Sequence, residues 1–237
     1  MAKRPIFVPK SSGNLMVITI PIEFTWHPGM SKSQKQKSIR SLHDVAKQTS
    51  GLENILEISS KSENELGVRL SAFNLMLEMQ NGIEASVEVL FQGSKVFTQG
   101  GPYIDIYQKM SREAKQDKRL KESGYLLAFR YANFDWPLTP QTAFYDWLYL
   151  TALRQNPSLA KKLLEYDGFS DIEFNPDKSI NCQAASAALY KALVKRELID
   201  LALSCPDEFI RIHEEQKKKP VPIQEDLFDS AYGRTAV

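Results

Sequence analysis

Residues 86–97 (SVEVLFQGSKVF) hold side chains whose types and spacing could carry out chemistry. Ser86 is typical of a helix N-cap, and the residues after it predict a helix to about Phe97. Side chains three, four and seven positions apart lie on one face of a helix. That face would gather a carboxylate, an amide, an ammonium group and an aromatic ring: Glu88, Gln92, Lys95 and Phe91.

This face has two interpretations. An ordinary surface helix would explain a Glu–Lys arrangement without any function, because exposed charge pairs of this kind are common and weak. Alternatively, the face is the wall of a pocket. Glu88 would then serve as a general acid or base, and a desolvated Lys95 could attack a sugar carbonyl. The second interpretation predicts an enzyme.

The elements that must position this face can be predicted from patterning. Apolar and β-branched segments predict four strands: 15–24, 53–59, 66–75 and 125–131. Helical spacing and capping residues predict the helices: 31–48, 86–97, 103–121, 139–154, 156–166, 181–204 and a shorter one from Pro206. The predicted fold class is therefore α+β, mainly α-helical.

The composition is that of a globular protein. Of the 237 residues, 43% are hydrophobic and 25% are charged, which excludes a chain that is disordered throughout. No apolar run approaches the roughly 20 residues that cross a bilayer, and no apolar segment of a signal peptide follows the basic N-terminus. With only Cys182 and Cys205, we expect two reduced thiols, no zinc site and a cytoplasmic location.

The domain organisation follows from these patterns and from the tail. Residues 1–60 are expected to form a β-containing extension packed on the core, and residues 61–216 the catalytic domain. Residues 217–237 contain two prolines and lack periodicity, which predicts a flexible tail.

Several segments resemble the NADAR superfamily, which includes the bacterial N-glycosidase of early riboflavin intermediates. VEVLFQGSKVF (87–97) is similar to the family's S-E-H-Y-F-Q-A-x-K-F helix, and LSAFNL (70–75) to its F-S-N-F segment. ALRQNPSLAKKLL (152–164) resembles A-L-x-x-K-F-x-x-N-P-x-L, and SINCQAAS (179–186) resembles G-x-N-x-L-G. The matches keep the family order and together span about residues 66–200.

Four further stretches resemble the subfamily found beside DarT-type DNA ADP-ribosyltransferase toxins: 100–103, 114–124, 136–153 and 171–184. This resemblance implies an antitoxin that hydrolyses the bond between ADP-ribose and guanine bases in DNA. Two positions depart from the family pattern. Val89 replaces a histidine and Ser94 replaces a glutamine, so no role of that histidine is carried over.

The resemblance also implies which residues form the site. Glu88 and Lys95 would be catalytic, with Lys95 either orienting the ribose or forming an imine with it. The ligand-binding set would be Phe73, Phe91, Gln92, Trp136 and Asn181. Core packing is an equally good explanation for the two phenylalanines, and an N-cap for Asn181. No metal or cofactor is implied, and the polar loop 171–178 is expected to border the site.

The implied partners are ADP-ribosylated DNA and a DarT-type toxin, and no membrane. Two alternatives remain: a small-molecule N-glycosidase acting on riboflavin intermediates, and a non-catalytic protein that binds ADP-ribose or the toxin. In the tail, QEDLF resembles the peptide that docks on the replicative sliding clamp, which predicts clamp binding through Gln224, Leu227 and Phe228.

The net charge of +1 hides unlike regions. Residues 1–50 carry a net +6 and residues 109–130 a net +4, whereas residues 51–108, which include the predicted catalytic helix, carry −5. A phosphate-bearing substrate needs only a local positive surface. If the basic regions adjoin the pocket, neutralising Lys32, Lys35 and Lys37 should weaken DNA binding.

Overall fold

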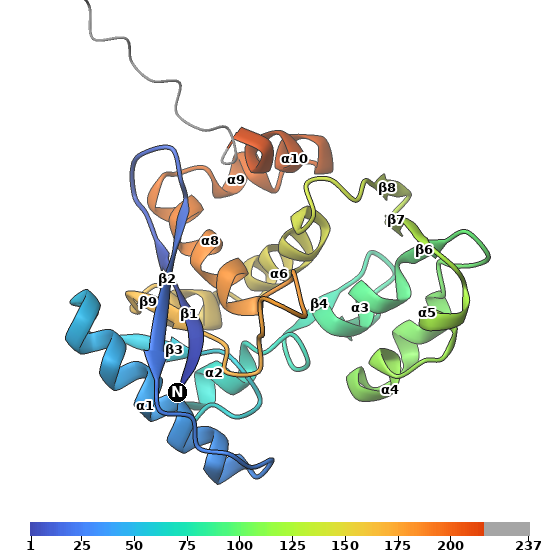
Figure 1. Cartoon of the computed structure of the whole chain (residues 1–237). Helices are drawn as coiled ribbons and strands as arrows, with labels where there is room; N and C mark the ends of the chain where they lie inside the picture. Colours follow the sequence, from blue (N-terminus) through green and yellow to red (C-terminus); the bar gives the residue numbers. More distant parts are fainter. Residues whose placement is uncertain (216–237) are drawn as a thin grey trace, which may run out of the picture.

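The computed structural model describes residues 1–215, which form a mixed α and β structure. Figure 1 shows the N-terminal strands and helix α1 on one side and helices α3 to α5 with a small sheet on the other, with α6 and α8 between them. The prediction of an α+β, mainly helical fold is confirmed.

A four-stranded sheet joins distant parts of the chain, with strand order β2-β1-β9-β3. Its members are β1 (Ala2–Pro9), β2 (Val17–Phe24), β3 (Ile55–Glu57) and β9 (Gly168–Ser170). β1 pairs antiparallel with β2 and β9, whereas β3 and β9 are parallel. The first 60 residues therefore share a sheet with residues 168–170, and the division into an extension and a catalytic domain stays a prediction.

Helix α1 (Lys32–Ser50) packs on this sheet through a small apolar cluster. Ser31 caps its N-terminus, since the Ser31 side chain accepts a hydrogen bond from the Gln34 amide. Ile39 and Leu42 of α1 are buried against Ile6 and Phe24 of the strands. This part of the chain matches the predicted strand 15–24 and helix 31–48, but β1 was not predicted.

The segment before the predicted catalytic helix folds differently from expectation. Residues 66–75 were predicted as a strand, and this prediction is wrong, because α2 (Glu65–Arg69) forms instead. The Asn64 side chain accepts a hydrogen bond from the Leu66 amide and starts the helix. Gly67 lies so close to β3 that a Cβ atom there would sit 1.9 Å from the Glu57 carbonyl oxygen.

Helix α3 (Val87–Gly93) follows the hairpin of β4 (Met76–Glu78) and β5 (Glu84–Ser86). Ser86 is its N-cap as predicted, but the predicted extension to Phe97 is wrong. The Gly93 carbonyl accepts from the Tyr103 amide and the Ser94 carbonyl from the Arg130 amide. These long-range bonds draw the chain out of the helix and into strand β6 (Lys95–Phe97).

Strand β6 belongs to a three-stranded antiparallel sheet with β7 (Leu126–Tyr131) and β8 (Phe134–Trp136). The predicted helix 103–121 is instead three short helices: η1 (Ile104–Gln108), α4 (Ser111–Lys115) and α5 (Arg119–Glu122). The strand prediction for 125–131 is confirmed by β7. Together these elements cover one side of α3.

The remaining helices carry the main core. They are α6 (Ala143–Gln155), α7 (Pro157–Leu163), α8 (Gln183–Lys195), α9 (Ile199–Ala202) and α10 (Pro206–Glu215). The predicted start of α6 at Pro140 is three residues early, and the predicted helix 181–204 is divided into α8 and α9. Most residues of α6 and α8 are buried, so these two helices form the centre of the core.

Both cysteines are free, Cys182 buried and Cys205 exposed. Among residues 1–215, no helix is both long and apolar enough to cross a membrane. The predicted clamp-binding residues Gln224, Leu227 and Phe228 lie outside the described part of the chain.

Candidate active site

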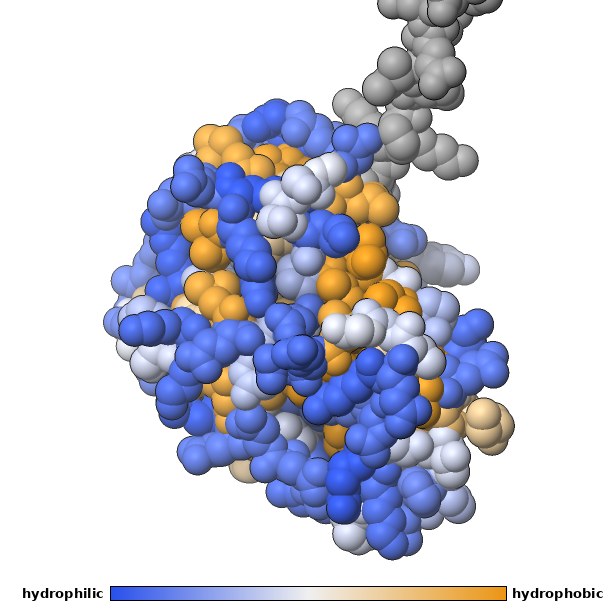
Figure 2. Space-filling model, turned by 90° about the vertical axis from the view of Figure 1, so that its left-hand side faces the viewer, coloured by the Kyte–Doolittle hydropathy of each residue, from blue (hydrophilic) through white to orange (hydrophobic). Residues whose placement is uncertain are grey.

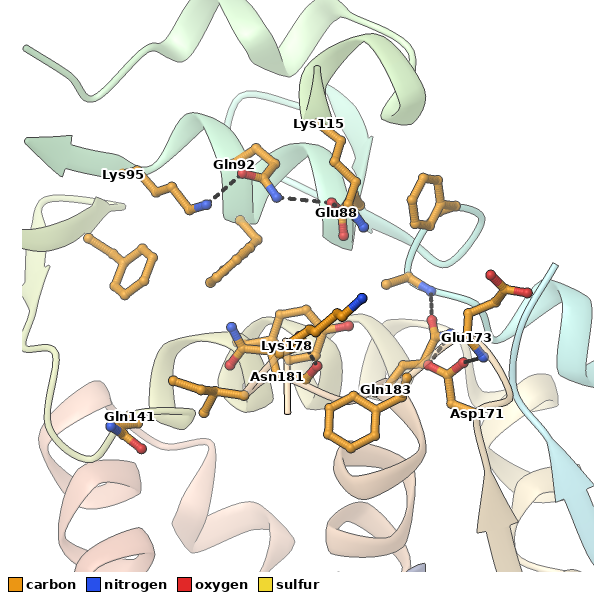
Figure 3. A pocket seen from close by; sticks show the side chains of 18 of the residues that line it. Glu88, Gln92, Lys95, Lys115, Gln141, Asp171, Glu173, Lys178, Asn181 and Gln183 are labelled. Carbon is orange, nitrogen blue, oxygen red and sulfur yellow. Dashed lines mark hydrogen bonds and ion pairs between the residues drawn. The ribbon is translucent and has the colours of Figure 1, made fainter. Parts of the chain in front are cut away.

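A pocket of about 640 Å³ lies between α3 and the loop that precedes α8, and we call it the central pocket. Figure 3 shows Glu88, Gln92, Lys95 and Lys115 on one side of it and Asp171, Asn181 and Gln183 on the other. A cavity of this size is typical of small-molecule and cofactor sites. Six of the seven predicted site residues line it: Phe73, Glu88, Phe91, Gln92, Lys95 and Asn181.

One wall is a hydrogen-bonded chain of three side chains, as the sequence indicated. Gln92 Nε2 donates to Glu88 Oε1 at 3.0 Å, and Lys95 Nζ donates to Gln92 Oε1 at 2.7 Å. Glu88 and Gln92 are buried, with 6% and 7% of their surface exposed. Gln92 therefore connects the carboxylate to the ammonium group and fixes the orientation of both.

Lys95 reaches this chain from strand β6 rather than from a continuous helix. Its Nζ also lies 4.9 Å from the centroid of the Phe91 ring. Burial lowers the pKa of Lys95, the nearby Glu88 carboxylate opposes that change, and Lys115 adds to it. A larger fraction of neutral amine is therefore available at Lys95 than at an exposed lysine.

Backbone contacts place Phe73 beside the first turn of α3. The Glu88 amide donates to the Ala72 carbonyl at 2.9 Å, and Ser111 Oγ of α4 donates to the Phe73 carbonyl at 2.9 Å. From α4, Lys115 extends its Nζ to 4.0 Å from Glu88 Oε1 and 5.3 Å from the Phe73 ring. Phe73 is partly exposed in the pocket and free to contact a ligand.

Phe91 packs in the core and also lines the central pocket, so its contact with a ligand stays a prediction. Its ring lies 5.1 Å from that of Phe129 and 5.2 Å, edge to face, from that of Tyr145. It is 8% exposed and also lines the central pocket. Phe91 thus joins the core to the wall of the pocket.

The opposite wall centres on a buried carboxyl group, Asp171. Gln183 Nε2 donates to Asp171 Oδ2 at 2.9 Å and to the Ile58 carbonyl at 2.7 Å, while Gln183 Oε1 accepts from the Ala72 amide at 2.7 Å. Burial, and next the charge of Glu57, raise the pKa of Asp171 to about 8. Asp171 therefore holds its proton more readily than an exposed aspartate, and both of its oxygens accept hydrogen bonds, Oδ1 from the Glu173 amide at 3.0 Å.

Behind Asp171 lies a second buried carboxyl group, Glu57, at the end of β3. It accepts hydrogen bonds from Ser59 Oγ at 2.6 Å, Ser170 Oγ at 2.5 Å and the Ile172 amide at 2.9 Å. Burial raises its pKa, and these three donors act in the other direction. Parallel pairing of β3 with β9 brings Glu57 and Ser170 together across 113 residues of sequence.

Helix α1 contacts this buried group through His43. His43 Nε2 lies 2.8 Å from Ser170 Oγ, and because Ser170 donates its hydroxyl hydrogen to Glu57, the imidazole nitrogen is the donor to Ser170. Burial, and next the charge of Lys47, lower the pKa of His43 to about 4. The neutral imidazole therefore links the N-terminal region to the inner wall of the pocket.

Asn181 lines the central pocket, and its Oδ1 atom is buried without a hydrogen-bond partner in the described residues. The N-cap of α8 is the next residue, Cys182, so the N-cap explanation for Asn181 does not apply. A buried acceptor without a partner costs free energy that a ligand donor would recover. Asn181 is thus suited to receive a hydroxyl or amine hydrogen of a bound molecule.

Trp136 is the one predicted site residue that the structure places elsewhere. It ends β8, is 1% exposed, and packs against Phe134, Phe144 and Trp147 with ring centroids 5.1 to 5.4 Å apart. It is not among the residues that line the central pocket. In this arrangement its aromatic ring stabilises the core behind the pocket, and direct stacking on a ligand stays a prediction.

The lining residues that were not assigned a role from the sequence include Lys115, Asp171 and Gln183. Asp171 belongs to the loop that was expected to border the site, so a partial signal existed. Gln183 lies within the resemblance to the family helix start, but its position did not show that it would hold Asp171. Nothing in the spacing of Lys115 indicated its approach to Glu88.

The sequence matches the family of DarT1-associated NADAR antitoxins over residues 2–222. The chain belongs to this family. The match includes residues 2–60, which supply His43 and Glu57 to the hydrogen-bonded group behind Asp171. A search of curated proteins returned no match.

Membership in the NADAR family fits the chemistry of the pocket. The family suggests hydrolase or glycosidase activity in general, and as an antitoxin this protein has a DarT toxin as its functional partner. Within residues 1–215, no cluster of three or more histidine, cysteine, aspartate or glutamate side chains is arranged to hold a metal ion.

Proposed function

We propose that this NADAR antitoxin removes ADP-ribose from guanine bases in single-stranded DNA by hydrolysing the N-glycosidic bond. The observation that carries the proposal is the Glu88–Gln92–Lys95 chain, which faces the Asp171 carboxyl group across the central pocket. A base inside a duplex cannot enter a pocket, so the substrate must be single-stranded or flipped out of the helix.

Glu88 is the group best placed to assist the departure of guanine. Cleavage at the anomeric carbon passes through a state that resembles an oxocarbenium ion, and a buried carboxylate stabilises that positive charge. In the direct route, a water molecule bonds to C1 and gives a proton to Glu88. The guanine nitrogen leaves with the electron pair of the broken bond and takes up a proton.

Lys95 supports a second route through an imine. Its neutral amine bonds to C1 as the bond to guanine breaks, and the base again leaves with the electron pair and gains a proton. The amine nitrogen then loses a proton. The ring oxygen leaves C1 with the electron pair of that bond and gains the remaining N–H proton, which opens the ribose to an imine, and water hydrolyses the imine to free Lys95 and ADP-ribose. The lowered pKa of Lys95 favours this route, whereas its hydrogen bond to Gln92 also suits a purely orienting role.

Reduction with borohydride distinguishes the two routes. A covalent adduct on the wild-type protein, absent from Lys95→Met, is expected if the imine forms. No adduct under conditions that trap known imine enzymes would leave Lys95 as an orienting group.

Other pocket residues would hold the ADP-ribose. The partly exposed ring of Phe73 offers a surface on which a purine can stack, and Asn181 Oδ1 can accept a ribose hydroxyl hydrogen. Lys178, which is exposed and lines the pocket, can pair with the pyrophosphate.

The test uses two substrates: a single-stranded oligonucleotide with one ADP-ribosylated guanine, and early riboflavin intermediates. We expect release of ADP-ribose from the oligonucleotide and a loss of about 100-fold or more in turnover with Glu88→Gln. Glu84→Gln, the same change at an exposed position outside the pocket, is the control and should keep full activity. Cleavage of only the riboflavin intermediates, or activity that survives Glu88→Gln, would contradict the proposal.

A further inference from the structure

The first turns of α1 have an unusual charge for a helix start. Lys32, Lys35 and Lys37 lie there, and the first turn holds no acidic residue. The N-terminus of a helix carries partial positive charge, so lysines at that end oppose helix stability and acidic residues favour it. Binding of an anionic partner would explain why three lysines lie at the end of the helix where they are less favourable.

This basic helix start adjoins the central pocket. Lys35 Nζ lies 3.2 Å from Glu173 Oε1, and Glu173 lines the pocket. The same ammonium group lies 4.7 Å from the centroid of the Trp26 ring, and the Arg4 guanidinium lies 5.6 Å from that ring. A partly exposed aromatic ring between two cations can stack on a base next to a phosphate.

A second set of cations approaches the pocket from α4 and α5. Lys115 lines the pocket, and Arg112, Lys118 and Lys121 are exposed on the same two short helices and the turn between them. In Figure 1, the loop between β9 and α8 lies between α1 on one side and α4 on the other. Lys178 of that loop lines the pocket as well, and Lys35 of α1 contacts the lining residue Glu173, so three segments bring a cation to the pocket.

Several of these cations have no carboxylate partner in the part of the chain that the structure describes. Within residues 1–215, no carboxylate oxygen lies within 4.0 Å of the Nζ atoms of Lys32, Lys37, Lys118 or Lys121. Figure 2, which views the molecule from the side that carries α1, shows hydrophilic side chains over most of the lower part of that face. These ammonium groups are therefore available to phosphates.

We propose that a single DNA strand crosses the mouth of the central pocket, with its phosphates on the start of α1 on one side and on α4–α5 on the other. This inference rests on the proposed function and specifies how the polymer, rather than the modified base, is bound. Phosphate contacts of this kind position a strand without reading its sequence. The pocket itself would then hold only the ADP-ribosylated guanine.

The experiment compares a long substrate with a short one. The long substrate is a 20-nucleotide single strand with one ADP-ribosylated guanine, and the short one is ADP-ribosylated guanosine, which cannot reach both basic sets. The variants are Lys32→Gln/Lys37→Gln and Lys118→Gln/Lys121→Gln. The control is Lys161→Gln/Lys162→Gln, which removes the same charge from exposed positions on α7.

Each test variant should raise KM for the oligonucleotide about tenfold and leave kcat and KM for the nucleoside within about twofold. The slope of log affinity against log salt should fall by about 1.4 for each pair, at roughly 0.7 per phosphate contact on a single strand. The control pair should change neither. Restoration of oligonucleotide affinity by Lys32→Arg/Lys37→Arg would show that the charge itself is required.

The outcomes separate the two proposals. If the wild-type protein releases ADP-ribose from neither substrate, the proposed function fails. If it cleaves both substrates but the test variants keep wild-type KM and salt dependence for the oligonucleotide, only the strand path is wrong. Equal effects of the test and control pairs would likewise overturn the path, because overall charge alone would then explain them.

Discussion

The two walls of the central pocket hold charged groups in opposite ways. On the α3 wall, Glu88 and Lys95 share a glutamine and lie near a further cation, so opposite charges are close together. On the opposite wall, Asp171 and Glu57 are two buried carboxyl groups near each other. Burial beside a like charge raises the pKa values of the second pair, whereas neighbouring cations keep the first pair in a polar network.

This difference indicates a division of roles. The α3 wall offers groups that can change charge during a reaction, since a carboxylate and a partly desolvated amine face the same cavity. The Asp171 wall offers a buried carboxyl group with a raised pKa, which Gln183 and the Glu173 amide hold in place through hydrogen bonds. Four substitutions test the division, ordered from the largest expected effect to the smallest.

Replacing Lys95 by methionine should lower turnover 100- to 1,000-fold with little loss of stability. The change removes the ammonium group and keeps most of the side-chain volume against Phe91. Release of ADP-ribose from the modified oligonucleotide measures it, with Lys195→Met, an exposed lysine of α8, as the control. Turnover within threefold of the wild type would show that the α3 wall does not need this charge.

Replacing Glu57 by alanine should instead lower the free energy of unfolding, by about 3 kcal/mol. The change leaves the hydroxyls of Ser59 and Ser170 and the Ile172 amide without their acceptor in a buried site. Urea denaturation measures the loss. Glu53→Ala, at an exposed position four residues earlier, should change stability by no more than about 0.5 kcal/mol.

Acid should weaken the support of the Asp171 wall through His43. Its folded-state pKa of about 4 is below the usual 6.5, so its contribution is present above pH 6.5 and is lost as the pH falls towards 4. Between pH 7 and pH 5 this loss amounts to about 2 kcal/mol. The free energy of unfolding of His43→Gln should fall by correspondingly less over the same pH range. Parallel curves of stability against pH for the variant and the wild type would contradict the prediction.

Replacing Asp171 by asparagine should have the smallest effect at neutral pH, a decrease of less than about tenfold in kcat/KM. The raised pKa favours the neutral carboxyl group there, and the amide oxygen of asparagine can keep one of its two hydrogen bonds, from Gln183 or from the Glu173 amide. Above about pH 8 the wild type gains a negative charge that repels phosphates, so its KM should rise more steeply than that of the variant.

The same titration has a consequence for stability. Because the folded-state pKa of Asp171 is raised, its contribution to stability is complete below about pH 4 and is lost as the pH rises through about 8. Asp171→Asn should therefore flatten the alkaline side of the stability curve. If Asp171→Asn keeps the wild-type pH dependence of both KM and stability, Asp171 is not the group that titrates near pH 8.

The wall formed by α3 could be predicted from the sequence to a larger extent than the wall that holds Asp171. Ser86 and the spacing of Glu88 and Gln92 predicted the helix start and the contents of one wall, because capping and helical periodicity are local properties. Lys95 was expected on the same helix as Glu88 and Gln92, and this was wrong. It lies in β6, which pairs with a strand some thirty residues later. Lys95 still joins the chain because its long side chain reaches back to Gln92.

The Asp171 wall had no comparable local signal. Glu57 is far along the chain from Asp171 and Gln183, and the parallel pairing of β3 with β9 brings it to the Asp171 side of the pocket. The predicted strand at 66–75 failed for a related reason: its apolar residues serve a helix and a turn that pack on β3. A pattern of apolar residues predicts that they are buried, but it does not predict which elements they pack against.

By itself, the amino-acid sequence determined which ionisable and aromatic groups this protein has, where α3 begins, and that basic and acidic residues are segregated along the chain. Only the tertiary structure decided which charges are buried together and which cations line the pocket. The physical reason is that charge is a property of each residue, whereas a pKa and a binding surface depend on burial and on neighbours that folding brings from far along the chain.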